Sequence, residues 1–393
     1  MSEISSSLYW TLPTPADFIH KVTDAARSAR SIILSFPEYM PVDPIHAMER
    51  GLKNANIHEP LILNIRDGMN ISVEIGTHFG GGNVPAEVLA HYEYGAQHAV
   101  VLQPHGKRAQ SHCEKYTEEF IKAIDESVGD VRLVMAIRNG LYMEDASSDK
   151  LKVIAFDGGL KYAEMDAYVA MRMVNYPGPG STNLYKHLVT EYGSFDPAIA
   201  EKLSRMETSM LLGLPLSLTD ILREDLIRWS KLSWVMGTKS NASVEIHPLH
   251  ECYSATHSGS DGERYKRLSG QRYWRACLKS IIPWLEERRP RIIQILDRPL
   301  QRIESAAGGH DKIQKKMGQQ MVNVTRDELE YNDIFYQSHR YEFNDIPFSQ
   351  LEHNAVGICR LAKAVRDDLS HLRPPSVDNL TNLISSMDLL IPG

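Results

Sequence analysis

An arginine and a histidine near the end of the chain have the types and the spacing that could cleave an RNA backbone. Arg366 and His371 belong to the helix-like stretch 361–372. A helix repeats every 3.6 residues, so the two side chains can converge where the helix meets a partner or a loop. The guanidinium can hold a phosphate through two parallel contacts, and the imidazole titrates near neutral pH. In the alternative interpretation, Asp368 ties Arg366 in a local ion pair that contributes little.

The last third of the chain, which carries this pair, has the apolar periodicity of helices. Helix-period segments are expected at 270–288, 290–306, 311–321, 326–337, 348–372 and 377–388. Pro374 and Pro375 follow the fifth segment directly and would end its helix. The sequence therefore predicts a C-terminal helical bundle that presents the Arg–His pair at the end of its penultimate helix.

In the first half of the chain, short apolar runs alternate with helical patterns. The runs of buried-strand type are 31–36, 60–65, 99–102, 131–137 and 151–156. Strands that alternate with helices at this spacing favour a mostly parallel sheet covered on both faces. The expected fold class is thus α/β followed by all-α.

Changes of pattern divide the chain into four expected segments. They are an N-terminal arm at 1–24, an α/β domain at 25–176, a helical segment with a polar loop at 177–264, and the helical bundle at 265–393. The boundary near 176 follows from the Pro- and Gly-rich stretch 176–181, which is a strong breaker of regular structure.

The loop after the first strand lacks the residues that hold a nucleotide phosphate. In open α/β folds, backbone amides at a helix N-terminus do this work. Here the loop 36–44 has no glycine and no lysine, and its three prolines lack an N–H. Glu38 and Asp43 would repel a triphosphate. The one alternative is Gly80–Gly82, which could form an anion nest, although it follows the alternating run Ser72–Ile75 and so also fits the tip of a strand hairpin.

This layout resembles a degenerate P-loop NTPase of the STAND type. The resemblance covers about residues 25–235 and includes the phrase Phe156–Leu160, with Asp166 and a helix behind it. A second phrase, Glu191–Asp196 before the helical run 198–203, is similar to inactivated members of bacterial conflict systems. The resemblance implies a domain that has lost its nucleotide chemistry. A doubly wound domain that never bound a nucleotide is the alternative.

The C-terminal helices look like a HEPN domain, whose signature is an arginine, a polar residue, a few more residues and a histidine. Here these are Arg366, Asp367 and His371, and the resemblance covers about residues 270–393. It implies that two such domains pair, that His371 moves the proton of a ribose 2′-hydroxyl, and that Arg366 binds the phosphate without a metal. Arg360 and Arg373 would add positive charge for RNA. Many HEPN-like domains, however, serve only as interaction modules.

Residues that could bind a metal gather in the polar loop before the last third. His247, His250, Cys252 and His257 have residue types that bind zinc, but a second ligand pair at a structural spacing is lacking. A solvated loop is the simpler interpretation. We expect no bound metal and no cofactor.

Composition places the chain among globular proteins. It has 393 residues, a formal charge of −7, four scattered cysteines, and no apolar run near the roughly 20 residues of a membrane span. With no signal-like start, this fits a reducing cytoplasm. An acidic chain does not wrap nucleic acid broadly, so any RNA contact would be local.

Three functions remain open from the sequence. The first is a prokaryotic anti-phage regulatory or effector protein with partner subunits and possible HEPN-type RNA cleavage. The second is a non-catalytic scaffold whose domains bind partner proteins. The third, and the weakest, is a nucleotide switch that uses Gly80–Gly82.

Overall fold

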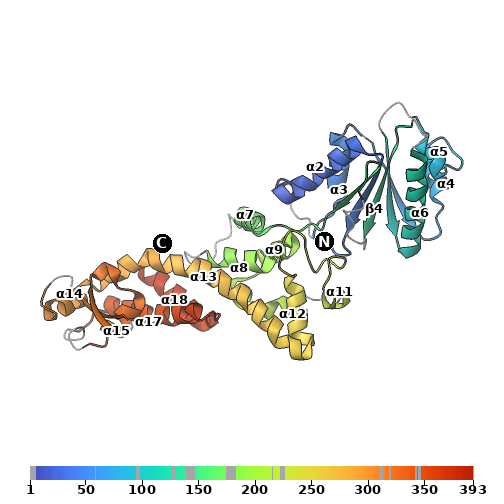
Figure 1. Cartoon of the computed structure of the whole chain (residues 1–393). Helices are drawn as coiled ribbons and strands as arrows, with labels where there is room; N and C mark the ends of the chain where they lie inside the picture. Colours follow the sequence, from blue (N-terminus) through green and yellow to red (C-terminus); the bar gives the residue numbers. More distant parts are fainter. Residues whose placement is uncertain are drawn as a thin grey trace. The chain divides into compact units, whose positions relative to one another are not determined.

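A computed structural model gives the fold of the chain (Figure 1). It describes residues 6–57, 59–93, 98–124, 129–138, 147–173, 183–214, 216–221, 226–309, 313–317, 320–340, 343 and 347–392. The chain divides into two compact units, each made of segments that are not consecutive. The N-terminal unit comprises Met1–Tyr168, Gly193–Glu201 and Leu222–Tyr253, and the C-terminal unit comprises Val169–Tyr192, Lys202–Ile221 and Ser254–Gly393.

A five-stranded parallel sheet forms the centre of the N-terminal unit, as the sequence predicts. Its strands are β1 (Ser31–Phe36), β2 (Leu61–Arg66), β3 (Ala99–His105), β4 (Arg132–Arg138) and β5 (Leu151–Ala155). Their order is β2-β3-β4-β1-β5, and every neighbouring pair is parallel. β1 pairs with β4 from Ser31 opposite Leu133 onward and with β5 from Ser31 opposite Leu151 onward. The loop after β1 therefore lies at the carboxyl edge of the sheet, where open α/β folds bind ligands.

Helices cover both faces of this sheet (Figure 1). On one face lie α2 (Pro13–Ser28) and α3 (Ile45–Asn54), and on the other lie α4 (Ile71–His78), α5 (Ala86–Ala90) and α6 (Lys107–Ala123). α2 and α3 meet closely because Gly51 has no side chain: a Cβ there would stand 2.7 Å from Val22 Cγ1. Phe120 of α6 and strand residues such as Val100 and Leu133 are fully buried in the core beneath α4–α6. The expected α/β class is confirmed.

One local prediction in this unit is wrong. The alternating run Ser72–Ile75 forms part of helix α4 and not an edge strand. Asn70 provides the reason, because its side chain accepts hydrogen bonds from the backbone N–H groups of Ser72 and Val73 and so caps the helix. The short alternation contains no information about this cap.

The remaining elements of the chain are mostly helical. They are α1 (Ser6–Tyr9), α7 (Tyr162–Arg172), α8 (Leu184–Gly193), α9 (Pro197–Leu203), α10 (Thr208–Leu212), η3 (Leu216–Ile221), α11 (Leu226–Ser230), α12 (Pro248–His257), η4 (Gly259–Asp261), α13 (Gly262–Ile295), α14 (Asp297–Ala306), β6 (Ile313–Met317), β7 (Gln320–Val324), η5 (Arg326–Glu328), α15 (Tyr331–Gln337), α17 (Gln350–Ser370) and α18 (Val377–Leu390).

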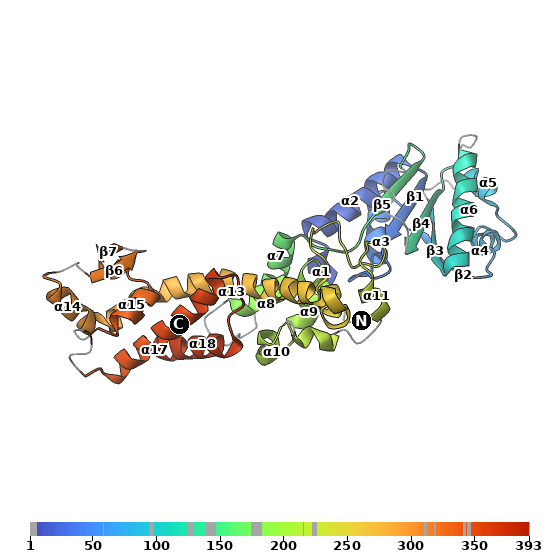
Figure 2. The same ribbon diagram turned by 60° about the horizontal axis from the view of Figure 1, so that its bottom comes forward.

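In the C-terminal unit, the long helix α13 packs beside α17, and α17 packs beside α15 and α18 (Figure 2). Ala276, Cys277 and Ile281 are fully buried along one face of α13. Trp274 Nε1 donates to the backbone oxygen of Leu369 at 2.8 Å and joins α13 to the end of α17. The expected helical character of this region is confirmed.

The predicted helix at 311–321 is wrong, because β6 and β7 form an antiparallel two-stranded sheet there. The register pairs Ile313 with Val324 and Lys315 with Val322. Ile313 is fully buried, whereas Gln320 and Met321 are exposed. In a segment as short as 311–321, the apolar residues fit both the 3.6-residue period of a helix and the two-residue period of a strand. The burial of Ile313 in the hairpin decides between the two.

The two units also differ from the four consecutive segments that the sequence predicts. The expected arm at 1–24 contains Phe18 and Val22, which are buried in the N-terminal unit. The expected middle segment at 177–264 is shared between both units. Glu191 of α8 accepts from Arg275 and Lys279 of α13 at 2.7 and 2.6 Å, and these bonds fix α8 in the C-terminal unit. The predicted boundary near 176 lies outside the described residues.

Candidate functional site

Arg366, the predicted phosphate contact, is engaged by two carboxylates. Its guanidinium lies 3.0 Å from Glu330 Oε2, through Nη2, and 3.5 Å from Glu286 Oε1, through Nη1. Glu286 belongs to α13 and Glu330 caps α15, so Arg366 bridges three elements of the C-terminal unit. Its side chain is 26% exposed. A phosphate would have to displace these carboxylates before it could occupy the guanidinium.

His371, the predicted proton-transfer residue, is the exposed C-cap of α17. Five residues correspond to roughly 140° around a helix, so the helix itself does not bring His371 to the same face as Arg366. The helix ends in a Schellman motif, in which the N–H of Arg373 donates to Asp368 at 2.9 Å and that of Leu372 to Leu369 at 3.2 Å. Leu372 has φ of 56°, the left-handed conformation that glycine usually adopts.

The other predicted RNA contacts lie on α17 or directly after it. Arg360 is exposed on α17, and Arg373 is 64% exposed and lies 3.7 Å from Asp368. Asp367 Oδ2 accepts from Lys363 Nζ at 2.6 Å. This ion pair raises the pKa of Lys363, mainly through the hydrogen bond that its ammonium donates to Asp367. Among the described residues, Arg373 is an exposed positive group at this helix end, Arg360 is exposed near the middle of α17, and Arg366 is paired with Glu286 and Glu330.

The loop after β1 is packed against another part of the N-terminal unit. The Glu38 N–H donates to the Val235 oxygen at 2.7 Å, and the loop residues Met40 and Val42 are buried. Gly237 has φ of 77°, and a Cβ there would stand 2.4 Å from the Tyr39 oxygen. The position where related folds hold a phosphate is thus covered by the segment that carries Val235 and Gly237.

A buried polar network fixes this arrangement. Asp196 Oδ2 accepts from the Tyr39 hydroxyl at 2.6 Å and lies 2.8 Å from His247 Nε2. Asp196 Oδ1 accepts from the backbone N–H groups of Ala198 and Ile199, at the start of α9, at 2.7 and 3.2 Å. The side chains of Asp196 and His247 are both fully buried. One carboxylate therefore joins the β1 loop, α9 and the segment before α12.

His247 has no nitrogen left for proton transfer to a substrate. Its Nδ1 accepts from the Leu249 N–H at 3.1 Å, so the proton of a neutral ring sits on Nε2 and points at Asp196. Trp229 packs on the ring with centroids 4.4 Å apart. Burial and the neighbouring Asp196 raise the pKa of Tyr39 well above its ordinary value, which keeps the hydroxyl a donor. The network is a structural brace, which we call the Asp196 brace.

Sequence reasoning missed the brace because Tyr39, Asp196 and His247 are far apart in the chain. His247 instead drew attention as part of a possible metal cluster with His250, Cys252 and His257. His250 Nδ1 bonds the Trp229 oxygen at 2.5 Å, and His257 is exposed. Among the described residues, no three His, Cys, Asp or Glu side chains are grouped to hold a metal ion.

The glycine loop Gly80–Gly82 lies between α4 and α5, and all three residues have φ near +90° (97°, 92° and 95°). The Gly81 N–H donates to the Gly76 oxygen at 2.7 Å. A Cβ on Gly76 would stand 2.1 Å from the Gly82 oxygen, so the loop folds back tightly onto α4. These glycines are required by this turn, whatever else they do.

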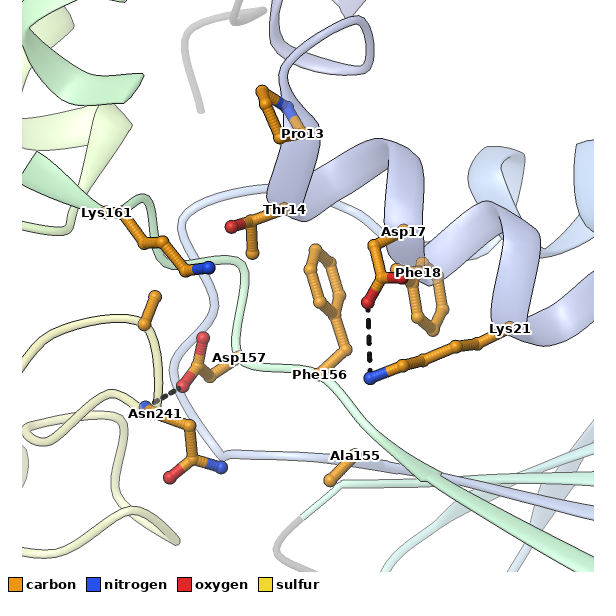
Figure 3. Close-up of a pocket in the computed structure, with 11 residues that line it drawn as sticks. Pro13, Thr14, Asp17, Phe18, Lys21, Ala155, Phe156, Asp157, Lys161 and Asn241 are labelled. Carbon is orange, nitrogen blue, oxygen red and sulfur yellow. Dashed lines mark hydrogen bonds and ion pairs between the residues drawn. The ribbon is translucent and has the colours of Figure 1, made fainter. Parts of the chain in front are cut away.

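A pocket of about 490 Å³ opens at the carboxyl end of β5 (Figure 3). Phe156 forms its base, and its ring stacks on Phe18 with centroids 4.3 Å apart. Lys161 extends into the pocket, and its ammonium group makes no hydrogen bond or ion pair with any described residue. Pro13, Thr14, Asp17, Phe18, Lys21, Ala155, Phe156, Asp157, Lys161, Asn241 and Ala242 line it.

The carboxylates at this pocket already have partners. Asp157 accepts from Gly159 N at 2.9 Å, from Asn241 N at 2.8 Å and from Trp234 Nε1 at 3.2 Å. Asp17 pairs with Lys21 at 3.2 Å. The pocket can hold a small polar molecule, and the oxygens of Asp157 are already engaged by three N–H donors.

No protein-family model and no curated protein matches the chain. Among the described residues, no helix is both long enough and apolar enough to cross a membrane. The geometry of the chain itself therefore carries the functional argument.

Proposed function

We propose that the chain is a non-catalytic adaptor of a multi-protein system, with an NTPase-like α/β unit that does not turn over nucleotides. The closed loop after β1 carries this proposal. Its prolines offer no N–H, the amide of Glu38 is bonded to Val235, and Tyr39 is held by Asp196. A triphosphate needs several free amides and a cation at this place, and the loop offers Glu38 and Asp43 instead.

The pairing of Arg366 supports the same function for the C-terminal unit. Two carboxylates neutralise its guanidinium and connect it to α13 and α15. Such a residue holds the helices of a bundle together. The resemblance to STAND-type and HEPN-like proteins suggests anti-phage defence in a cytoplasm as the setting. The four cysteines, which are buried and free, agree with a reducing compartment.

Assays of turnover test the adaptor proposal. The purified chain is incubated with magnesium and ATP or GTP, and released phosphate is measured. We expect the wild type and the Tyr39→Phe variant to release the same background amount of phosphate, because neither protein offers a phosphate site at this loop. Hydrolysis above this background that depends on the chain would contradict the proposal.

The exposed end of α17 favours RNA cleavage as the second candidate function. His371 and Arg373 are exposed there, and Arg360 is exposed near the middle of the same helix. On this hypothesis the chain cuts structured RNA without a metal, and His371→Ala abolishes the cutting. His353→Ala changes an exposed histidine of the same helix and should leave cutting intact. Equal cutting by both variants would eliminate His371 as the catalytic group.

A further inference from the structure

The small sheet in the C-terminal unit has one protected edge and one open edge. β6 is fixed to α15: Gln337 Nε2 donates to the Gln314 oxygen at 2.7 Å, and Lys315 Nζ pairs with Asp333 at 2.6 Å. β7 is hydrogen-bonded only to β6, since no other described residue bonds its backbone. Figure 2 shows the hairpin beside α15 at the outside of the unit. The backbone groups on the outer side of β7 are therefore available.

β7 lacks the features that usually keep an edge strand from pairing. Exposed edges are normally blocked by a charged side chain, a proline or a bulge. The sequence of β7 is Gln320-Met321-Val322-Asn323-Val324, which contains no charge, no proline and no glycine. Met321 is 58% exposed, and Gln320 and Asn323 are exposed as well. A two-stranded sheet is marginal in water, so an added strand would stabilise it.

We propose that β7 pairs with β7 of a second copy of this chain, antiparallel about a twofold axis, to form a four-stranded sheet. An antiparallel pair of identical strands is self-complementary, as a twofold interface requires. The register that pairs all five residues places Val322 opposite its own copy and Met321 opposite Asn323. Because β7 carries no charge, no like charges meet across the axis.

The occupant is a second copy and not a foreign strand, because β7 is uncharged and the described lysine side chain of β6, that of Lys315, is already paired within the unit. A strand from another protein is usually selected by side-chain pockets or by charges beside the open edge. Here Lys315 is bound by Asp333 and Glu330, and β7 itself offers neither charge nor pocket. Backbone pairing with an equally uncharged strand is what this edge can recognise. The interface is small, so we expect a weak dimer with Kd on the order of micromolar.

Charge variants of β7 in the full-length chain test this inference by sedimentation velocity over a range of protein concentrations. Met321→Lys with Asn323→Lys places like charges opposite each other, and Met321→Glu with Asn323→Glu does the same with the other sign. We expect the wild type to dimerise as concentration rises, each double variant to stay monomeric, and their equimolar mixture to regain the dimer. Both positions are exposed, so unchanged circular dichroism shows that the fold is retained.

The matched control adds the same charge elsewhere in the unit. Leu351→Lys with Asn354→Lys changes two exposed residues of α17 and should dimerise as the wild type does. A wild type that stays monomeric at every concentration overturns the proposal, and it would leave a foreign strand as the partner of this edge. Double β7 variants that dimerise like the wild type overturn it as well. A mixture that fails to associate contradicts pairing of β7 with itself.

Discussion

Removing the carboxylate of Asp196, at the start of α9, should destabilise the N-terminal unit more than any single change in the loop after β1. Asp196 accepts from four donors: the Tyr39 hydroxyl, His247 Nε2 and the N–H groups of Ala198 and Ile199. In Asp196→Ala, the two side-chain donors stay in place without an acceptor. The His247 side chain is fully buried, so water cannot replace the lost partner without opening the structure.

The expected magnitude follows from these bonds. Loss of a helix N-cap costs about 0.5–2 kcal/mol. Each buried donor that is left unsatisfied costs about 1–3 kcal/mol. Allowing for relaxation around the smaller side chain, we expect Asp196→Ala to lower the free energy of unfolding by about 3–6 kcal/mol, a large share of the 5–15 kcal/mol typical of a domain.

A graded series of variants makes this prediction specific. Tyr39→Phe removes one donor and should cost about 1 kcal/mol. Asp196→Asn keeps an oxygen for the helix cap, but its amide N–H groups meet the N–H of His247, so its cost should lie between those of Tyr39→Phe and Asp196→Ala. Asp43→Ala is the control: among the described residues that exposed carboxylate bonds only the Ile45 N–H, at 3.1 Å, and its loss should cost about 0.5 kcal/mol.

Urea unfolding followed by tryptophan fluorescence measures the series. Trp229 reports on the network directly, because its ring lies 4.4 Å from that of His247. Far-UV circular dichroism on the same samples follows the helices of both units. If Asp196→Ala costs less than about 1 kcal/mol, the bonds do not hold the loop, and the reasoning is refuted. Equal costs for Asp196→Asn and Asp196→Ala would also refute it.

Three further predictions follow from single positions. Burial lowers the pKa of His250 below its ordinary value, so its contribution to stability is present above about pH 6.5 and is lost as pH falls through the folded pKa. The His250→Asn variant keeps a donor for the Trp229 oxygen, but its side chain does not titrate. We therefore expect the free energy of unfolding of this variant to change less between about pH 7.5 and pH 5.5 than that of the wild type. Burial raises the pKa of Cys113 to about 12 and that of Cys252 to about 11, so a disulfide-forming reagent should modify these thiols only at the rate of unfolding; rapid modification of folded protein would contradict this. Leu372→Gly should raise the stability of the C-terminal unit by about 1 kcal/mol, since φ of 56° costs leucine about that much, and a lowered thermal midpoint would contradict this account of the helix end.

The elements that could be predicted from the sequence are those with strong local signals. All five parallel strands are apolar runs bounded by polar turns, and each lies within one or two residues of its expected start. Buried strands need such runs because both faces of the sheet are covered. The fifth helical segment of the last third, 348–372, corresponds to α17, which begins with the Ser349–Glu352 capping box and ends before Pro374. These signals lie within a few residues of each other, so a single sequence reveals them.

The candidate site depends on contacts between distant residues, which a single sequence does not reveal. The spacing of Arg366 and His371 is local, but the partners of Arg366 lie on α13 and at the start of α15. Asp196 meets His247 across 51 positions of the chain, with no pattern that links them. In β6 and β7 the local pattern of apolar residues fits either a helix or a strand, and the burial of Ile313 favours the strand. Whether His371 cleaves RNA stays a prediction.

Because Glu38 and Tyr39 in the loop after β1 are bonded within the chain, we expect the N-terminal unit to hold no nucleoside triphosphate there. Isothermal titration of the full-length chain with ATP and magnesium tests it most directly. We predict no saturable binding at ligand concentrations up to about 1 mM, which corresponds to less than about 4 kcal/mol of binding free energy. Saturable micromolar binding that Tyr39 or Glu38 substitutions alter would place a nucleotide at this loop and contradict the account.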